Sequence, residues 1–80
     1  TGFNSIHVTF DAGRMDSAHL EQLRDICRRH PGKHDCFLHI LLPNQSETVV
    51  YLGDSSRINI SQPLKEDVER LLGHGSTRFH

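Results

Sequence analysis

Residues 36–42 read CFLHILL, residues 43–46 read PNQS, and residues 47–52 read ETVVYL. The first stretch has the length of a strand and is almost wholly apolar, which is typical of a central strand with a neighbour on each side. Pro, Asn and Ser in the second stretch favour turn conformations. The three stretches together predict a β-hairpin at the centre of the fold.

The sequence before this hairpin predicts a strand followed by a helix. Apolar and polar residues alternate through residues 5–10, and a period of two indicates a half-buried strand. Asp16 then has the chemistry of a helix N-cap, and Pro31–Gly32 ends the helix. The predicted apolar stripe of this helix consists of Leu20, Leu23, Ile26 and Cys27. We expect the strand, the helix and residues 36–42 to form a right-handed crossover unit.

The sequence after the hairpin predicts a short strand over residues 57–60 and a helix over residues 62–72. Ser61 suits the N-cap of this helix and Gly73 its end. Residues 74–80 show no periodicity, so we expect a mobile tail. The predicted fold is therefore α+β in the order β-α-β-β-β-α, with a three-stranded antiparallel meander. One mixed four-stranded sheet would carry both helices on one face, and the open face would suit a partner.

Size and composition indicate one small domain without a large internal chamber. The chain has 80 residues and a formal net charge of -1, which excludes a strongly basic nucleic-acid module. We interpret residues 1–80 as a single domain, ordered over about 5–73, that is excised from a longer protein because the sequence begins at Thr1 without Met. No apolar run approaches the roughly 20 residues of a membrane span, and no secretory leader is apparent. We therefore expect a cytoplasmic protein that does not enter a membrane.

Two cysteines and two histidines form the one spacing that could suit a metal. The pattern is Cys27-x2-His30-x3-His34-x-Cys36, and two thiolates with two imidazoles can hold zinc tetrahedrally. However, Cys27 belongs to the apolar stripe of the first helix and Cys36 to the central strand, where cysteine packs as a small hydrophobe. We expect no cofactor, and a small zinc-stabilised domain remains the alternative.

Basic residues gather near the end of the first predicted helix. They are Arg24, Arg28, Arg29, His30, Lys33 and His34. Such a cluster could bind an acidic partner or single-stranded nucleic acid, although cations also favour a helix C-terminus for electrostatic reasons. Catalytic patterns are missing, since no Gly-x-Ser-x-Gly motif and no carboxylate pair is apparent. We therefore expect this fragment to be no enzyme.

The overall pattern resembles a known family. The stretches that carry the resemblance are Ile6-x-Val8-x-Phe10-Asp11, Leu20-x2-Leu23, Arg29-His30-Pro31-Gly32, Phe37-Leu38-His39-Ile40, Val49-Val50-Tyr51-Leu52, Ile58-x-Ile60-Ser61 and Val68-Glu69-Arg70-Leu71-Leu72-Gly73. Together they resemble the extreme C-terminal domain of the alpha subunit of the bacterial replicative DNA polymerase, the family C enzyme of DNA polymerase III. The parent subunit is a DNA-directed DNA polymerase, a nucleotidyltransferase whose catalytic carboxylates lie in earlier domains.

The resemblance implies a role in DNA replication without chemistry of its own. In that family this domain docks the polymerase to the tau subunit of the clamp loader, so tau and the rest of the alpha subunit are the expected partners. Auxiliary binding of single-stranded DNA through residues 24–34 is an alternative. The expected partner-binding residues are Arg28, Arg29, Arg70, Arg78 and Phe79.

Overall fold

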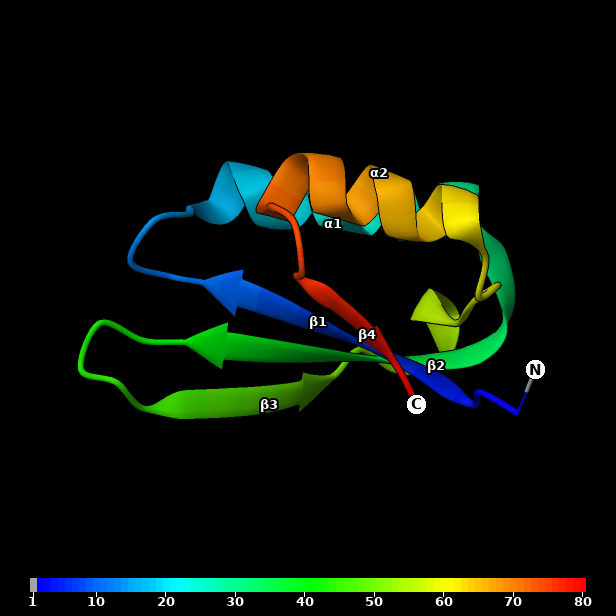
Figure 1. Ribbon diagram of the computed structural model, residues 1–80, viewed down its shortest axis with the longest axis horizontal. Coiled ribbons are helices and arrows are strands. Elements are labelled where there is room, and N and C mark those ends of the chain that lie inside the picture. Colours follow the sequence, from blue (N-terminus) through cyan, green and yellow to red (C-terminus); the bar gives the residue numbers. More distant parts are fainter. Residues whose placement is uncertain (1) are drawn as a thin grey trace.

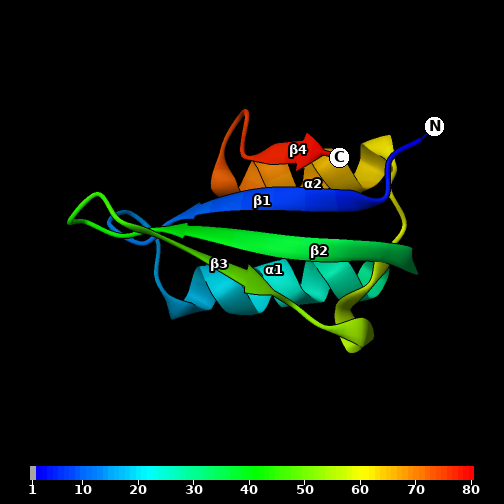
Figure 2. The same ribbon diagram turned by 90° about the horizontal axis from the view of Figure 1, so that it is seen from below.

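Four strands form one mixed sheet in the computed structural model, which describes residues 2–80. The strands are β1 (Ser5–Asp11), β2 (Pro31–Leu41), β3 (Glu47–Tyr51) and β4 (Thr77–Phe79), in the spatial order β3-β2-β1-β4. The helices α1 (Ser17–Arg29) and α2 (Gln62–Leu72) lie side by side on one face of the sheet (Figure 1). Seen from below, the other face of the sheet is open (Figure 2). The α+β class, the mixed four-stranded sheet and its two helices are confirmed.

The two central strands are parallel, and β1 alternates as predicted. β1 pairs with β2 from Ser5↔Asp35 to Asp11↔Leu41, and α1 connects them. Ile6, Val8 and Phe10 are buried beneath the helices. The predicted hairpin is also confirmed, because β2 and β3 pair antiparallel across the turn.

The predicted N-caps of both helices are confirmed. Asp16 accepts hydrogen bonds from the backbone N–H groups of Ala18 and His19, and the His19 ring accepts one from the Asp16 N–H. Ser61 accepts one from the N–H of Leu64. Each cap satisfies donors that have no partner within the first turn, so both helices begin where the sequence predicts.

The predicted strand over residues 57–60 is wrong. A short 3-10 helix, η1 (Asp54–Ser56), precedes this segment, and Ile58 makes only isolated bridges to Pro31 and His34. Ile58 is completely buried, so the segment is apolar here because it packs into the core and not because it forms a strand of the sheet. Gly32 allows this close approach, because a Cβ there would lie 2.5 Å from the Asn59 backbone nitrogen.

The fourth strand is built instead by the segment predicted to be a mobile tail. β4 pairs antiparallel with β1, which places Phe79 opposite Ile6 and Arg78 opposite His7. The carboxylate of Glu69 on α2 holds this segment, accepting hydrogen bonds from the N–H of Gly75 and from the N–H and hydroxyl of Thr77. The element order is therefore β-α-β-β-α-β, and the expectation of a mobile tail is wrong.

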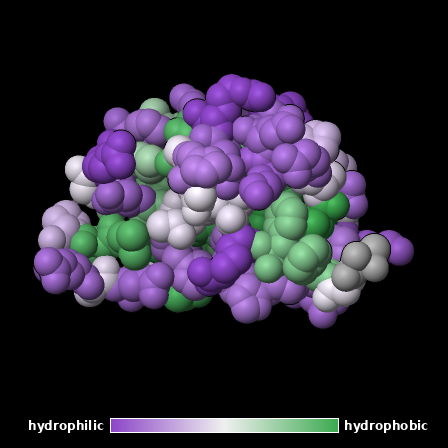
Figure 3. Space-filling model, in the orientation of Figure 1, coloured by the Kyte–Doolittle hydropathy of each residue, from purple (hydrophilic) through white to green (hydrophobic). Residues whose placement is uncertain are grey.

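The core lies between the helices and the two central strands. The apolar stripe of α1 contributes Leu23, Ile26 and Cys27, and α2 contributes Leu64 and Val68. In the space-filling view the surface over α2 is mostly hydrophilic, and hydrophobic patches lie lower, along the sheet (Figure 3). Within residues 2–80, neither helix has the length and apolar character that a membrane span needs.

Candidate partner-binding site

A groove between the outer faces of α1 and α2 brings two of the predicted partner-binding residues together. Its volume is about 370 Å3. The lining residues are Gln22, Asp25, Ile26, Arg29, Asp67, Arg70 and Leu71. Arg29 comes from the last turn of α1 and Arg70 from the last turn of α2. Helix packing therefore joins residues that are far apart in the sequence, and Ile26 and Leu71 give the groove an apolar floor.

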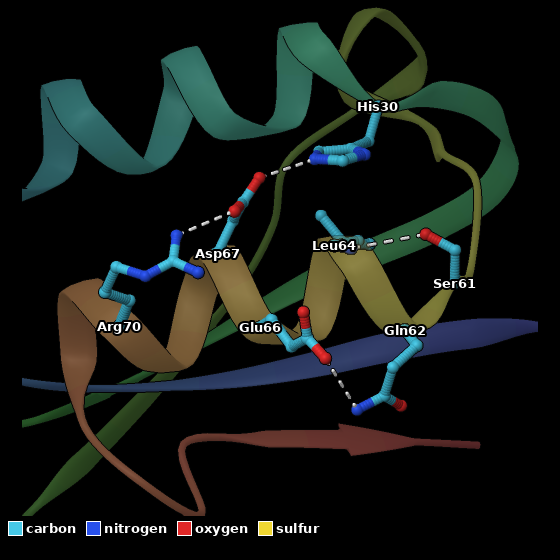
Figure 4. A network of polar contacts seen from close by, with 7 residues as sticks. All are labelled: His30, Ser61, Gln62, Leu64, Glu66, Asp67 and Arg70. Carbon is cyan, nitrogen blue, oxygen red and sulfur yellow. Dashed lines mark hydrogen bonds and ion pairs between the residues drawn. The ribbon is translucent and has the colours of Figure 1, made fainter.

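A polar network fixes the α2 side of this groove (Figure 4). The Asp67 carboxylate bonds to His30 Nε2 at 2.8 Å and accepts a hydrogen bond from Arg70 at 3.0 Å. The hydrogen bond to His30, and next the one from Arg70, hold the pKa of Asp67 below its usual value. Both oxygens of this carboxylate are therefore engaged inside the molecule.

The start of α2 is fixed by shorter-range contacts in the same network (Figure 4). Ser61 caps the helix, and the amide of Gln62 donates to Glu66 one turn later. α2 buries Leu64, Val68 and Leu72, and Asp67, Arg70 and Leu71 line the groove beside α1. The apolar stripe of α2 thus determines which of its faces lines the groove.

The charged residues that line the groove differ in whether they have a partner of opposite charge. Asp25 accepts a hydrogen bond from Arg28 at 3.2 Å, and Asp67 is occupied by His30 and Arg70. Arg29 is exposed and forms no hydrogen bond or ion pair through its side chain within residues 2–80. The one unmatched charge in this groove, among the described residues, is therefore a guanidinium.

The structure separates the other three predicted residues from this groove. Arg28 lines a different hollow of about 150 Å3, beside Cys27 and η1. Arg78 and Phe79 lie in β4, at one edge of the sheet. Phe79 is half-buried and packs against Phe3, with ring centroids 5.6 Å apart. The five residues therefore occupy three places, and only Arg29 and Arg70 line the groove.

The four residues with metal-ligand spacing do not form the zinc site that the spacing permits. His30 is bonded to Asp67, and Cys27 and Cys36 are buried in the core. Hydrogen bonding from Cys36 lowers the pKa of Cys27, and the same bond together with burial raises the pKa of Cys36. Across residues 2–80, no three His, Cys, Asp or Glu side chains are grouped so that they could hold a metal ion.

The open face of the sheet carries a chain of polar contacts that runs through two histidines of neighbouring strands. His7 Nδ1 lies 2.7 Å from His39 Nε2, His39 Nδ1 lies 3.0 Å from the Glu47 carboxylate, and Ser5 Oγ lies 3.3 Å from His7 Nε2. Burial, and next the proximity of His39, lowers the pKa of His7. The alternation of β1 and the pairing of β1 with β2 place these side chains on one face. The four hollows described on the surface are lined by other residues, so this chain of contacts borders no substrate pocket among them.

Aromatic rings also run across the open face. His7 stacks on Phe37 with centroids 4.9 Å apart, and Phe37 contacts Tyr51 at 5.3 Å. His80 contacts His7 at 4.7 Å. The His7 and Phe37 rings are stacked, whereas the contacts to Tyr51 and His80 are tilted by 39° and 55°. Comparison of the chain with protein-family models, curated proteins and solved structures gives no match.

Proposed function

We propose that this chain is a non-catalytic protein-docking module whose partner binds in the groove between α1 and α2. The observation that carries the proposal is the exposed, unmatched guanidinium of Arg29 above the apolar floor of Ile26 and Leu71. A partner segment that combines a carboxylate with a neighbouring aliphatic side chain is complementary to this arrangement. The carboxylate would pair with Arg29, and the aliphatic group would cover the floor.

The resemblance to the C-terminal domain of the DNA polymerase III alpha subunit suggests who supplies that segment. On this proposal the partner is the tau subunit of the clamp loader, and the domain joins it to the rest of the polymerase in the cytoplasm during DNA replication. The nucleotidyl-transfer chemistry belongs to other domains of the parent subunit. On this proposal, the side-chain contacts on the open face of the sheet form a hydrogen-bond network without a catalytic role. They link Ser5, His7, His39 and Glu47.

The charges and rings favour a protein partner over single-stranded nucleic acid. Arg24 pairs with Glu21 at 3.5 Å and Arg28 pairs with Asp25 at 3.2 Å, so carboxylates offset part of the basic region at residues 24–34. On the open face, the rings of His7 and Phe37 stack on each other, which occupies one face of each against base stacking. We therefore expect no tight binding of single-stranded DNA with the steep salt dependence of phosphate contacts.

Two arginines of α1 provide the test. Arg29→Ala removes the unmatched cation of the groove, whereas Arg24→Ala removes an equal charge that lines other hollows and pairs with Glu21 outside the groove. We expect Arg29→Ala to weaken binding of purified tau at least about tenfold in calorimetric titration, and Arg24→Ala to change it less than about twofold. Equal effects of both substitutions, or no binding of tau by the unchanged chain, would contradict the proposal.

A further inference from the structure

β3 forms an edge of the sheet that lacks the usual protection against pairing. It is the outermost strand, and all five of its residues are exposed, including Val49 at 52% and Tyr51 at 44%. Its sequence ETVVY contains no Lys and no Pro, the residues that commonly block a strand edge. β4 at the opposite edge has only three residues, with Arg78 in its centre. The outward N–H and C=O groups of β3 are therefore a template for another strand.

Apolar or aromatic side chains lie next to β3 on both faces of the sheet. On the helix face, the register places Val50 opposite Leu38, beside a hollow of about 280 Å3. This hollow is lined by Leu20, Glu21, Leu23, Arg24, Leu38 and Leu52. On the open face, the register places Val49 opposite His39 and Tyr51 opposite Phe37. A strand added beside β3 would thus bury apolar surface above and below the sheet, in addition to completing the hydrogen bonds of the edge.

We propose that the strand which pairs with this edge is β3 of a second copy of the chain, in a symmetric antiparallel dimer centred on Val49. In this register Val49 faces its own counterpart, Glu47 faces Tyr51 of the second copy, and Thr48 faces Val50 of the second copy. Each copy places its Thr48 beside Val50 of the other, in line with Leu38 at the hollow, and the two four-stranded sheets become one. The same patch serves both copies, as two-fold symmetry requires.

The charges of the edge agree with this register. Glu47 is the only charged residue of β3, and its carboxylate bonds to His39 of its own chain at 3.0 Å. The proposed pairing places the two copies of Glu47 at opposite ends of the joint, so no like charges stand opposite each other. Glu21 and Arg24, which line the hollow, pair with each other within α1. Tyr51, which would face Glu47 of the second copy, donates its hydroxyl to Asp35 and Asp54, and Arg57 pairs with both of these carboxylates.

Charges introduced at the symmetry centre test the dimer directly. Val49→Lys places two ammonium groups opposite each other, and Val49→Glu places two carboxylates there. We expect sedimentation of the unchanged chain between about 10 µM and about 1 mM to show a reversible dimer, and each variant alone to have a dissociation constant at least about tenfold higher. An equimolar mixture of the two variants should dimerise again, because Lys then faces Glu. Phe3→Lys is the matched control, since it replaces a similarly exposed residue outside β3 and should leave the dimer unchanged.

A second measurement uses the unchanged chain alone, in case a variant folds poorly. Amide hydrogen exchange of β3 should slow as the protein concentration rises, while the exchange of β4 stays constant. A chain that remains monomeric at the highest concentration, a dimer that both Val49 variants retain, or a mixture that fails to dimerise would overturn the proposal. Tau binding through Arg29 is independent of these outcomes, because the groove between the helices is a different surface.

Discussion

At one edge of the sheet, β4 has three residues and is held by a carboxylate of α2; at the other edge, β3 has five residues and is exposed along its whole length. The edge at β4 is made by residues 77–79, which follow α2 in the sequence and pair with the distant β1. The exposed edge is made by a local hairpin. The comparison shows that the exposed edge, β3, pairs with the strand next to it in the sequence, whereas β4 depends on contacts with the distant β1 and with Glu69.

The largest expected effect comes from removing the protected edge. Deletion of residues 76–80 would take away β4 and uncover the side of β1 that pairs with Phe79 and Thr77. We expect the free energy of unfolding to fall by about 3 kcal/mol or more, a large part of the stability of a domain of this size. Urea unfolding followed by circular dichroism measures this change. An unchanged midpoint would mean that residues 76–80 contribute nothing and behave as a mobile tail.

A smaller loss of stability is expected when only the hydrogen bonds between Glu69 and the β4 segment are removed. Glu69→Ala removes the acceptor for Gly75 and Thr77, and we expect a loss of about 1.5–3 kcal/mol, as for hydrogen bonds to a charged group. Glu66→Ala is the matched control on the same helix, because Glu66 bonds only to exposed Gln62 and should cost less than about 0.5 kcal/mol. Equal losses for the two variants in urea unfolding would show that Glu69 does not hold β4.

Acid sharpens the same comparison. The hydrogen bond from the Thr77 hydroxyl contributes most to keeping the pKa of Glu69 below its usual value of 4.5. Below that pH, the Glu69 carboxylate therefore binds fewer protons in the folded chain than in the unfolded chain. This contribution to stability is complete above about pH 4.5 and is lost as the pH falls through the folded-state pKa. Glu69→Gln should therefore make the unfolding free energy less dependent on pH below 4.5 than in the unchanged chain. Parallel pH curves for the two proteins would contradict this account.

The smallest expected effect lies at the exposed edge. Val49→Thr keeps a β-branched side chain at a residue that is half exposed, so we expect the unfolding free energy of the dilute chain to change by less than about 0.5 kcal/mol. Val8→Thr makes the same replacement in buried β1 and should cost about 1–3 kcal/mol, because the new hydroxyl is buried. Thermal unfolding of both variants at low concentration checks the contrast. A large loss for Val49→Thr would show that β3 is not an exposed edge.

Local sequence signals predicted most of the fold. The alternation of β1, the hairpin and the two caps at Asp16 and Ser61 depend on neighbouring residues, and the structure has all of them. The failures share a cause, since both depend on contacts between distant segments. Ile58 is apolar because it is buried against β2 without forming a ladder, and β4 is ordered because Glu69 reaches Thr77.

The candidate site was predictable in its residue types and not in its geometry. The basic end of α1 and the exposed Arg70 could be identified in the sequence, but their meeting in one groove depends on how α1 and α2 pack. Nor could the sequence show that His30 would turn to Asp67 instead of joining Cys27 and Cys36 in a metal site. Ion pairs within each helix engage Arg28 and Arg70, and Arg29 remains unmatched among the described residues.

The central claim, that a partner binds between the two helices, is tested most directly by mapping amide chemical shifts of the labelled chain while unlabelled tau is added. The account predicts that the largest changes fall on Gln22, Ile26, Arg29, Arg70 and Leu71, while the amides of η1 beside Arg28 stay constant. Changes concentrated at β4 or at η1, with the helical groove silent, would contradict it.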